Sequence, residues 1–432
     1  MNKKIFSIFL LLLITIDSIP CKNLISFATD TTIATITSDS EQDLVNAVAK
    51  LNKSGGIIYI DTPVINISSK KTIGLIGTKE GGIIGKQQSN GQYPRIDFKN
   101  ARNAGSTARG FTINGSNQFI KYLIIENSGD NGIYIAGSKN IIDHVITRYN
   151  NDTGIQISNG AKSNQLNYCY SYRNVDVGTF GGNADGFAPK LQASDNIFNY
   201  CFAWDNSDDG WDSYDYEGQA STTVSYLHCG CWNNGNPDVF TGKYDYDNGK
   251  VLDKGLWTIQ QLIASDSKFE SNYNNKKFSI SNAKINGMTA ENWIAQAHEE
   301  MNGNGFKFGS KYTPQNTSIK RTAEYSVAFD HKAKGFDNNG SKKITGYFSN
   351  CVSFNNLINY KLPYTFSKWS NNWSWNPIDV DQYSQSQTLK TPKDKNAAIK
   401  KFYAVRDAII QNCRHNIFND KVNFDNAIKS LA

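Results

Sequence analysis

Basic runs and nucleic-acid-binding motifs are both absent from this 432-residue sequence, whose 45 basic and 39 acidic residues give a formal net charge of only +6. We therefore expect no nucleic-acid partner. Apolar stretches long enough to cross a membrane are also absent after the first residues, so we expect no membrane span. Glycine (34 residues), aromatic residues (12%), asparagine and serine are abundant instead, a composition typical of many short strands and turns.

The first residues have the pattern of an export signal. A basic start, MNKK, precedes the apolar stretch IFSIFLLLLITI at residues 5–16, and SFA ends at Ala28 as a small-residue cleavage site. This apolar stretch is too short to span a bilayer comfortably, although a membrane anchor is the alternative interpretation. The sequence thus predicts a signal peptide at residues 1–28 and a secreted protein.

Seven segments of the remaining chain share one pattern, and they start at successive intervals of 22, 24, 32, 28, 97 and 25 residues. They are YLIIENS (122–128), HVITRYN (144–150), YCYSYRN (168–174), YCFAWDN (200–206), HCGCWNN (228–234), YSVAFDH (325–331) and NCVSFNN (350–356). A glycine followed by an apolar residue recurs after several of them, as in Gly132-Ile133, Gly154-Ile155 and Gly210-Trp211. A repeat that is mostly between twenty and thirty residues long, with short strands in each repeat, indicates a solenoid. The simplest solenoid of this kind is a parallel β-helix, whose coils stack about 4.8 Å apart.

Stacked coils place like residues in columns. One column faces the interior: Cys169, Cys201 and Cys229. We expect free buried thiols there, although disulfides are the alternative in an exported protein. Another column falls at a turn and predicts a hydrogen-bonding ladder of amides: Asn150, Asn174, Asn206 and Asn234.

Helices are predicted at both ends of the solenoid and in one interruption. Residues 40–52 have apolar residues at helical spacing with Ser40 as a possible N-cap, and such a helix would cover the open end of the first coil. Residues 393–416 form a second amphipathic pattern. We expect a β-helix domain at 29–392, an insertion at about 235–300 with helical patterns at 255–275 and 289–301, and a C-terminal helical tail at 393–432.

The stretch NSDDGWD at residues 206–212 crowds three carboxylates, Asp208, Asp209 and Asp212. In the preceding coil, NADGFAPK, Asp185 stands before Gly186 as Asp209 stands before Gly210, so these two carboxylates should stack. Four carboxylates so close are destabilising unless a cation bridges them. Hard oxygen ligands without histidine or thiolate favour Ca²⁺ over zinc, although a solvated acidic turn is the alternative.

The next segment in register is GNGFKFGS at residues 303–310, in which Lys307 takes the column that Asp212 holds one coil earlier. A lysine beside a metal-bound acidic cluster is an acid–base constellation, whereas its simpler interpretation is a salt bridge to Asp212. Lys190 could help to bind an anionic sugar, or could be a solvated surface lysine.

The motifs NADGFAPK, NSDDGWD and GNGFK, in this order on a β-helix, resemble the family 9 polysaccharide lyases, a pectate lyase family, over about residues 40–390. The resemblance implies a right-handed parallel β-helix and cleavage of polygalacturonate by β-elimination. It also implies that Lys307 is the base and that the Ca²⁺ ligands are Asp185, Asp208, Asp209 and Asp212.

Three other functions remain open at this point. A lyase of rhamnogalacturonan or another acidic glycan would use the same chemistry. A β-helical glycoside hydrolase would use paired aspartates without lysine or metal. It usually has a histidine before glycine, and none of the five histidines here precedes one. A non-catalytic carbohydrate-binding solenoid would need Ca²⁺ only for structure. In every case we expect an acidic polysaccharide or related sugar as the partner, and a monomer.

Overall fold

The computed structural model describes residues 31–69, 72–99, 101, 108–191, 193–215, 222–240, 290–310, 319–341, 344–362, 366–375, 382–383 and 387–432. The predicted signal peptide and the helical pattern at 255–275 lie outside the described residues. Within them no helix is both long enough and apolar enough to cross a membrane.

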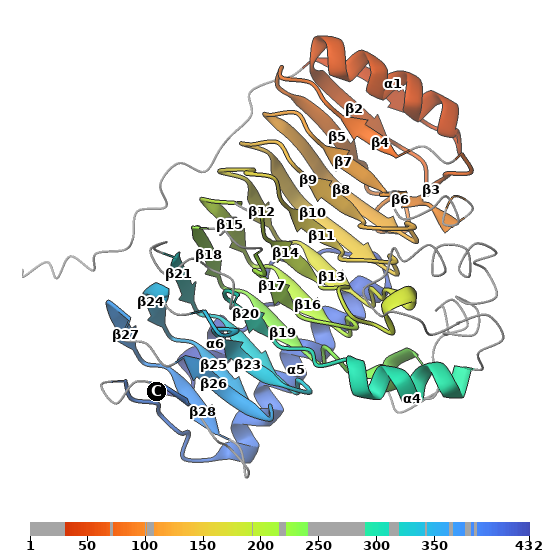
Figure 1. Ribbon diagram of the computed structural model, residues 1–432. Helices are drawn as coiled ribbons and strands as arrows, with labels where there is room; N and C mark the ends of the chain where they lie inside the picture. Colours follow the sequence, from red (N-terminus) through yellow and green to blue (C-terminus); the bar gives the residue numbers. More distant parts are fainter. Residues whose placement is uncertain are drawn as a thin grey trace, which may run out of the picture.

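The chain winds into a parallel β-helix, as the sequence predicted (Figure 1). One sheet has ten strands: β4 (Ile73–Leu75), β7 (Phe111–Ile113), β9 (Ile133–Ile135), β11 (Ile155–Ile157), β14 (Phe187–Pro189), β17 (Trp211–Asp212), β20 (Phe306–Lys307), β23 (Lys334–Asp337), β26 (Ile358–Leu362) and β29 (Gln382–Tyr383). We call it the short-strand sheet, and its neighbouring strands pair in parallel in chain order.

The other sheet has nineteen strands and wraps two sides of the coil. They are β1 (Thr32–Ile36), β2 (Gly56–Ile60), β3 (Val64–Asn66), β5 (Gly81–Gly85), β6 (Arg95–Asp97), β8 (Gln118–Glu126), β10 (Ile141–Arg148), β12 (Gln165–Asn167), β13 (Tyr170–Tyr172), β15 (Asn196–Asn199), β16 (Phe202–Trp204), β18 (Thr223–Leu227), β19 (Gly230–Trp232), β21 (Ile319–Glu324), β22 (Val327–Phe329), β24 (Ile344–Ser349), β25 (Val352–Phe354), β27 (Lys368–Ser370) and β28 (Trp373–Trp375). Strands β8 and β10 run through the corner between the two sides, whereas later coils break there into two strands.

The corner after each repeated segment is built from a left-handed residue followed by the predicted amide column. Residues in the left-handed region include Tyr149 (φ 59°) and Asp205 (φ 55°), each directly before a column asparagine. In the column, Asn174 Nδ2 donates to Asn206 Oδ1 at 2.9 Å, and Asn206 Nδ2 donates to Asn234 Oδ1 at 3.0 Å. The ladder is therefore confirmed, and it pairs amide and backbone groups that a sharp corner would otherwise leave without partners.

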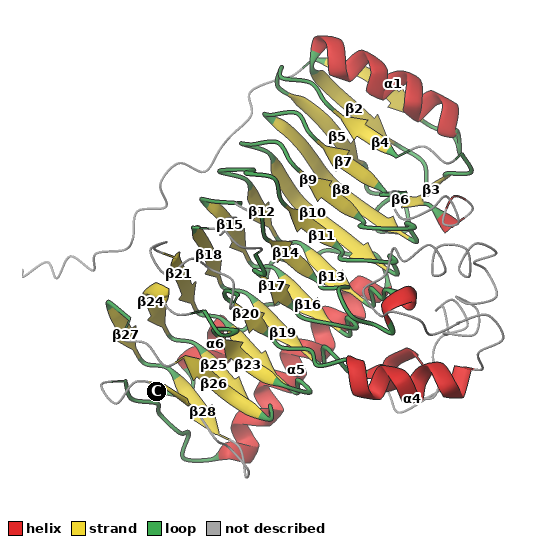
Figure 2. Cartoon of the chain, in the orientation of Figure 1, coloured by secondary structure: helices red, strands yellow, loops and turns green. Residues whose placement is uncertain are grey.

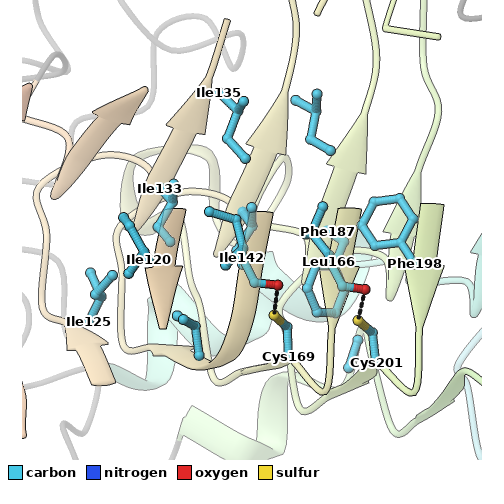
Figure 3. Close-up of a cluster of buried hydrophobic side chains, with 14 of the residues drawn as sticks. Ile120, Ile125, Ile133, Ile135, Ile142, Leu166, Cys169, Phe187, Phe198 and Cys201 are labelled. Carbon is cyan, nitrogen blue, oxygen red and sulfur yellow. Dashed lines mark hydrogen bonds between the residues drawn. The ribbon is translucent and has the colours of Figure 1, made fainter. Parts of the chain in front are cut away.

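The interior is filled by one continuous apolar cluster, rich in isoleucine in the first coils and in aromatic rings later. Cys169, Cys201 and Cys229 are fully buried there as free thiols, which confirms the sequence-based expectation. Figure 3 shows the Cys169 and Cys201 thiols donating to carbonyl oxygens of the preceding coil, those of Ile142 at 3.4 Å and Leu166 at 3.3 Å.

Helices cover the solenoid where the sequence placed them (Figure 2). Helix α1 (Glu41–Ser54) begins with Ser40 as its N-cap and buries Leu44, Ala47, Val48 and Leu51 against the first coils. Helix α5 (Lys395–Arg414) packs against the side of the solenoid, where Phe402 contacts rings of β25 and β28. Helix α6 (Asp425–Lys429), which lies within the helical tail expected at 393–432, continues this cover.

The insertion between β19 and β20 is helical at both described ends. A 3₁₀ turn, η3 (Pro237–Phe240), follows β19, and helix α4 (Ala290–Glu300) precedes β20 and contacts that turn. The pattern at 289–301 thus forms the predicted helix. Another 3₁₀ turn, η2 (Val177–Thr179), lies in the loop before β14.

Candidate metal and lyase site

The predicted register of the acidic coils is confirmed on the short-strand sheet. Phe187 of β14 pairs with Trp211 of β17, and Trp211 pairs with Phe306 of β20. Asp212 therefore pairs with Lys307, the next residue on each strand. Because the aromatic residues are fully buried, Asp212 and Lys307 project from the outer face.

The residue before each repeated glycine forms a column of its own at the edge of this sheet. Asp185 and Asp209 occupy it in successive coils, and the Asp209 N–H donates to Asp185 Oδ1 at 3.1 Å. Thr153, one coil before, donates through Oγ1 to Asp185 Oδ2 at 3.2 Å. Asn304, one coil after, donates to Asp209 Oδ1 from its backbone N (2.7 Å) and its Nδ2 (2.8 Å).

Neither Thr153 nor Asn304 was selected from the sequence. Both stand directly before the repeated glycine, at Gly154 and Gly305, so extending the column by one coil on each side would have identified them. Their hydrogen bonds hold the two stacked carboxylates in fixed orientations.

Three of the four predicted metal ligands converge. One carboxylate oxygen from each of Asp185, Asp209 and Asp212 lies within 4.8 Å of the other two, and all three residues are buried. Asp208 is not part of this group: it is partly exposed, and its Oδ2 accepts from the Asn183 N–H at 3.0 Å.

Two lysines approach the three carboxylates. Lys307 Nζ lies 2.8 Å from Asp209 Oδ2 and 3.3 Å from Asp212 Oδ1. Lys190 Nζ lies 3.4 Å from Asp185 Oδ2 and 3.3 Å from Asp212 Oδ2. Lys190 is thus mostly buried and ion-paired, with a side-chain exposure of 16%. The interpretation of Lys190 as a solvated surface lysine is therefore wrong.

The pKa values of the aspartates and of Lys307 are shifted, because negative charge is crowded in a buried place. Burial raises the pKa of Asp185 well above its usual value and that of Asp209 to about 7, although the neighbouring ammonium groups act in the opposite direction. Burial also opposes ionisation of Asp212, yet Lys307 and Lys190 outweigh it and keep that pKa low. Burial lowers the pKa of Lys307, but the neighbouring aspartates raise it by more, so this pKa lies well above its usual value.

The donor set fits a hard divalent cation. Two oxygens on opposite sides of a Ca²⁺ ion are separated by about 5 Å, since each Ca–O bond is about 2.4 Å long, and the three carboxylates meet that limit. The four aspartates against the two lysines leave a formal charge of −2 when all are ionised. No histidine or cysteine belongs to the group, which argues against zinc.

The fold and the site together define a parallel β-helix protein with buried, stacked carboxylates and a lysine on one outer face. The chain belongs to the Pel9A-like family of right-handed β-helix proteins, because the model of the "Pel9A-like, right handed beta helix region" matches residues 26–255. The handedness and the family expected from the sequence motifs are thereby confirmed.

Individual relatives agree with this family. Pectate lyase L of Dickeya chrysanthemi is 30% identical over 255 residues, which cover 58% of this chain and 44% of that protein. The chain thus matches less than half the length of this curated relative. The crystal structure of pectate lyase Pel9A superposes with a TM-score of 0.57 at 22% identity, covering 85% of this chain and 81% of that one. A structure named rhamnogalacturonan lyase gives a TM-score of 0.50 at 16% identity, covering 85% and 86% of the two chains. The fold is therefore that of pectate and rhamnogalacturonan lyases.

Proposed function

We propose that the protein is a secreted, Ca²⁺-dependent lyase that cleaves polygalacturonate-type acidic polysaccharide by β-elimination. The observation that carries the proposal is the contact of Lys307 with Asp209 and Asp212 on the outer face of the short-strand sheet. A hydrolase built on two aspartates would not need this lysine, and a structural cation site would not need a base at its edge.

Lys307 is the proposed base. It would remove the proton on C5 of a uronate, and the C5–H electrons would form the C4–C5 double bond. The bond from C4 to the glycosidic oxygen would break at the same time, and the leaving oxygen would keep the bonding electrons and take a proton from solvent to become a hydroxyl. No water adds to the broken bond, so the product carries an unsaturated uronate at its new end. Only the neutral amine can accept the proton, and the lysine side chain is suited to this role because its pKa shifts readily with its surroundings.

The proposed cation ligands are Asp185, Asp209 and Asp212, and Asp208 adds a fourth negative charge from outside this group. When bound, the cation would withdraw negative charge from the C6 carboxylate of the uronate and from the aspartates that hold the proton on Lys307. Asn304 fixes the Asp209 carboxylate through two hydrogen bonds, so that one oxygen is oriented while Oδ2 faces the lysine. Lys190 balances Asp185 and Asp212, and we propose that it also contributes to binding the anionic sugar.

A panel of acidic polysaccharides tests the proposal. Polygalacturonate, rhamnogalacturonan and alginate are incubated with the purified protein in Ca²⁺ and in chelator, and the products are analysed. We expect Ca²⁺-dependent unsaturated ends from polygalacturonate. Saturated ends would indicate a hydrolase, and binding without cleavage would indicate a carbohydrate-binding solenoid. Unsaturated ends from rhamnogalacturonan alone would replace the proposed substrate.

A further inference from the structure

Beyond Lys307, charged residues continue along the outer face of the short-strand sheet. Lys307 of β20 pairs in register with Asp337 of β23, which pairs with Lys361 of β26. The residues that alternate with them, Phe336, Tyr360 and Leu362, are fully buried, so Asp337 and Lys361 project outward as Lys307 does. Because neighbouring strands lie about 4.8 Å apart, Lys361 stands about 10 Å beyond Lys307 along the solenoid axis.

Within the part of the chain that the structure describes, the ion pairs along this line leave one cation without a counterion. Lys307 is paired with Asp209 and Asp212, and Asp337 is paired with Lys334 at 3.2 Å. Lys361 is half-buried and has no ion-pair partner among the residues that the structure describes. The group of Lys334, Asp337 and Lys361 therefore carries a formal charge of +1, next to an acidic cluster of formal charge −2.

We infer that Lys361 binds a second carboxylate of the uronate chain and thereby helps to fix the direction in which the substrate lies. This inference rests on the proposed function. A polyuronate held with one sugar at Lys307 presents further carboxylates along its length, and the Lys361 ammonium, which has no ion-pair partner among the described residues, lies on the same face and in the same column. On the opposite side of the acidic cluster the sheet offers Gln156 and Tyr134 in register, and two cations there are already ion-paired: Lys190 with Asp185 and Asp212, and Arg109 with Asp130 at 3.5 Å. Lys361 thus makes the β23–β26 side the more favourable one for an anion.

Kinetics on oligogalacturonates of increasing length test this role. The variant Lys361→Gln should raise KM by about 2- to 5-fold on long oligomers, as expected for one partly exposed ion pair, and kcat should fall by less than KM rises. The defect should grow with oligomer length, since a short oligomer held at Lys307 does not reach β26. It should also shrink at high salt, because screening weakens the pair in the wild type. The control Lys320→Gln removes an exposed lysine of β21 on the other sheet.

The outcomes separate this inference from the proposed function. If the wild type cleaves no uronate polymer, the proposed function itself fails. If the wild type is active and Lys361→Gln has the wild-type KM at every length, Lys361 binds no carboxylate and the inference is overturned. An equal defect at every length would also overturn it, because the effect would then be structural. Repeating the comparison on polygalacturonate and rhamnogalacturonan shows which polymer supplies the carboxylate.

Discussion

Replacing Asn206, the central member of the amide ladder, should destabilise the solenoid strongly. The side chain is fully buried and makes four hydrogen bonds: Oδ1 accepts from Asn174 N (3.2 Å) and Asn174 Nδ2 (2.9 Å), and Nδ2 donates to Asn234 Oδ1 (3.0 Å) and Ser171 O (3.1 Å). In Asn206→Ala the buried Asn174 N–H loses its acceptor, which costs about 1–3 kcal/mol. The other three bonds each contribute about 0.5–1.5 kcal/mol, so we expect a total loss of about 2.5–7.5 kcal/mol.

Chemical denaturation followed by tryptophan fluorescence measures this loss. The matched control is Asn46→Ala on the exposed face of α1, where the amide only accepts a hydrogen bond from Gln42 and the change should stay within about 0.5 kcal/mol. A loss below about 1 kcal/mol for Asn206→Ala would refute the view that the ladder holds the coils in register.

Three further predictions concern the cation ligands and the C-terminal cover. Asp209→Ala should need much more Ca²⁺ for activity while staying folded, since it removes one anionic ligand; undiminished activity in chelator would contradict this. Lys190→Gln should bind Ca²⁺ more tightly in calorimetric titration, because the Lys190 ammonium competes for the same oxygens, and unchanged affinity would argue against that competition. His144 lies 2.7 Å from both Asp143 and Asp420; burial lowers its pKa, but the two carboxylates outweigh burial and raise it. Its contribution to stability should therefore be complete below about pH 6.5 and lost as the pH rises through the raised pKa, so the wild type should lose more stability than His144→Gln between pH 6 and 9. Equal losses would place the pH dependence elsewhere.

The repeats made much of this structure predictable. Because each coil stacks on the previous one, a glycine that recurs in successive coils fixes which residues share a column. Counting residues from this glycine was enough to place Asp185, Asp209, Asp212 and Lys307. Contacts across columns were not predictable in this way. Lys190 reaches its two aspartates through a long, flexible side chain whose direction the register does not determine.

Two other features exceed what the register can decide. The register places Asp209, and not Asp208, in the column before the repeated glycine, but it does not determine that the Asp208 carboxylate accepts the Asn183 N–H instead of joining the group of three carboxylates. Helix α6 has only five residues, too few for a periodic apolar pattern, and its burial depends on the aromatic side of the solenoid against which it packs.

The identity of the base tests the account most directly. The unsaturated product absorbs ultraviolet light. The initial rate at which this absorbance rises is measured across pH on polygalacturonate with Ca²⁺, for the wild type and for Lys307→Arg. We expect a wild-type rate that rises through mildly alkaline pH, as the neutral fraction of the amine grows, and almost no turnover in Lys307→Arg, because a guanidinium keeps its proton. A Lys307→Arg rate close to that of the wild type would show that Lys307 supplies only positive charge and would contradict its role as the base.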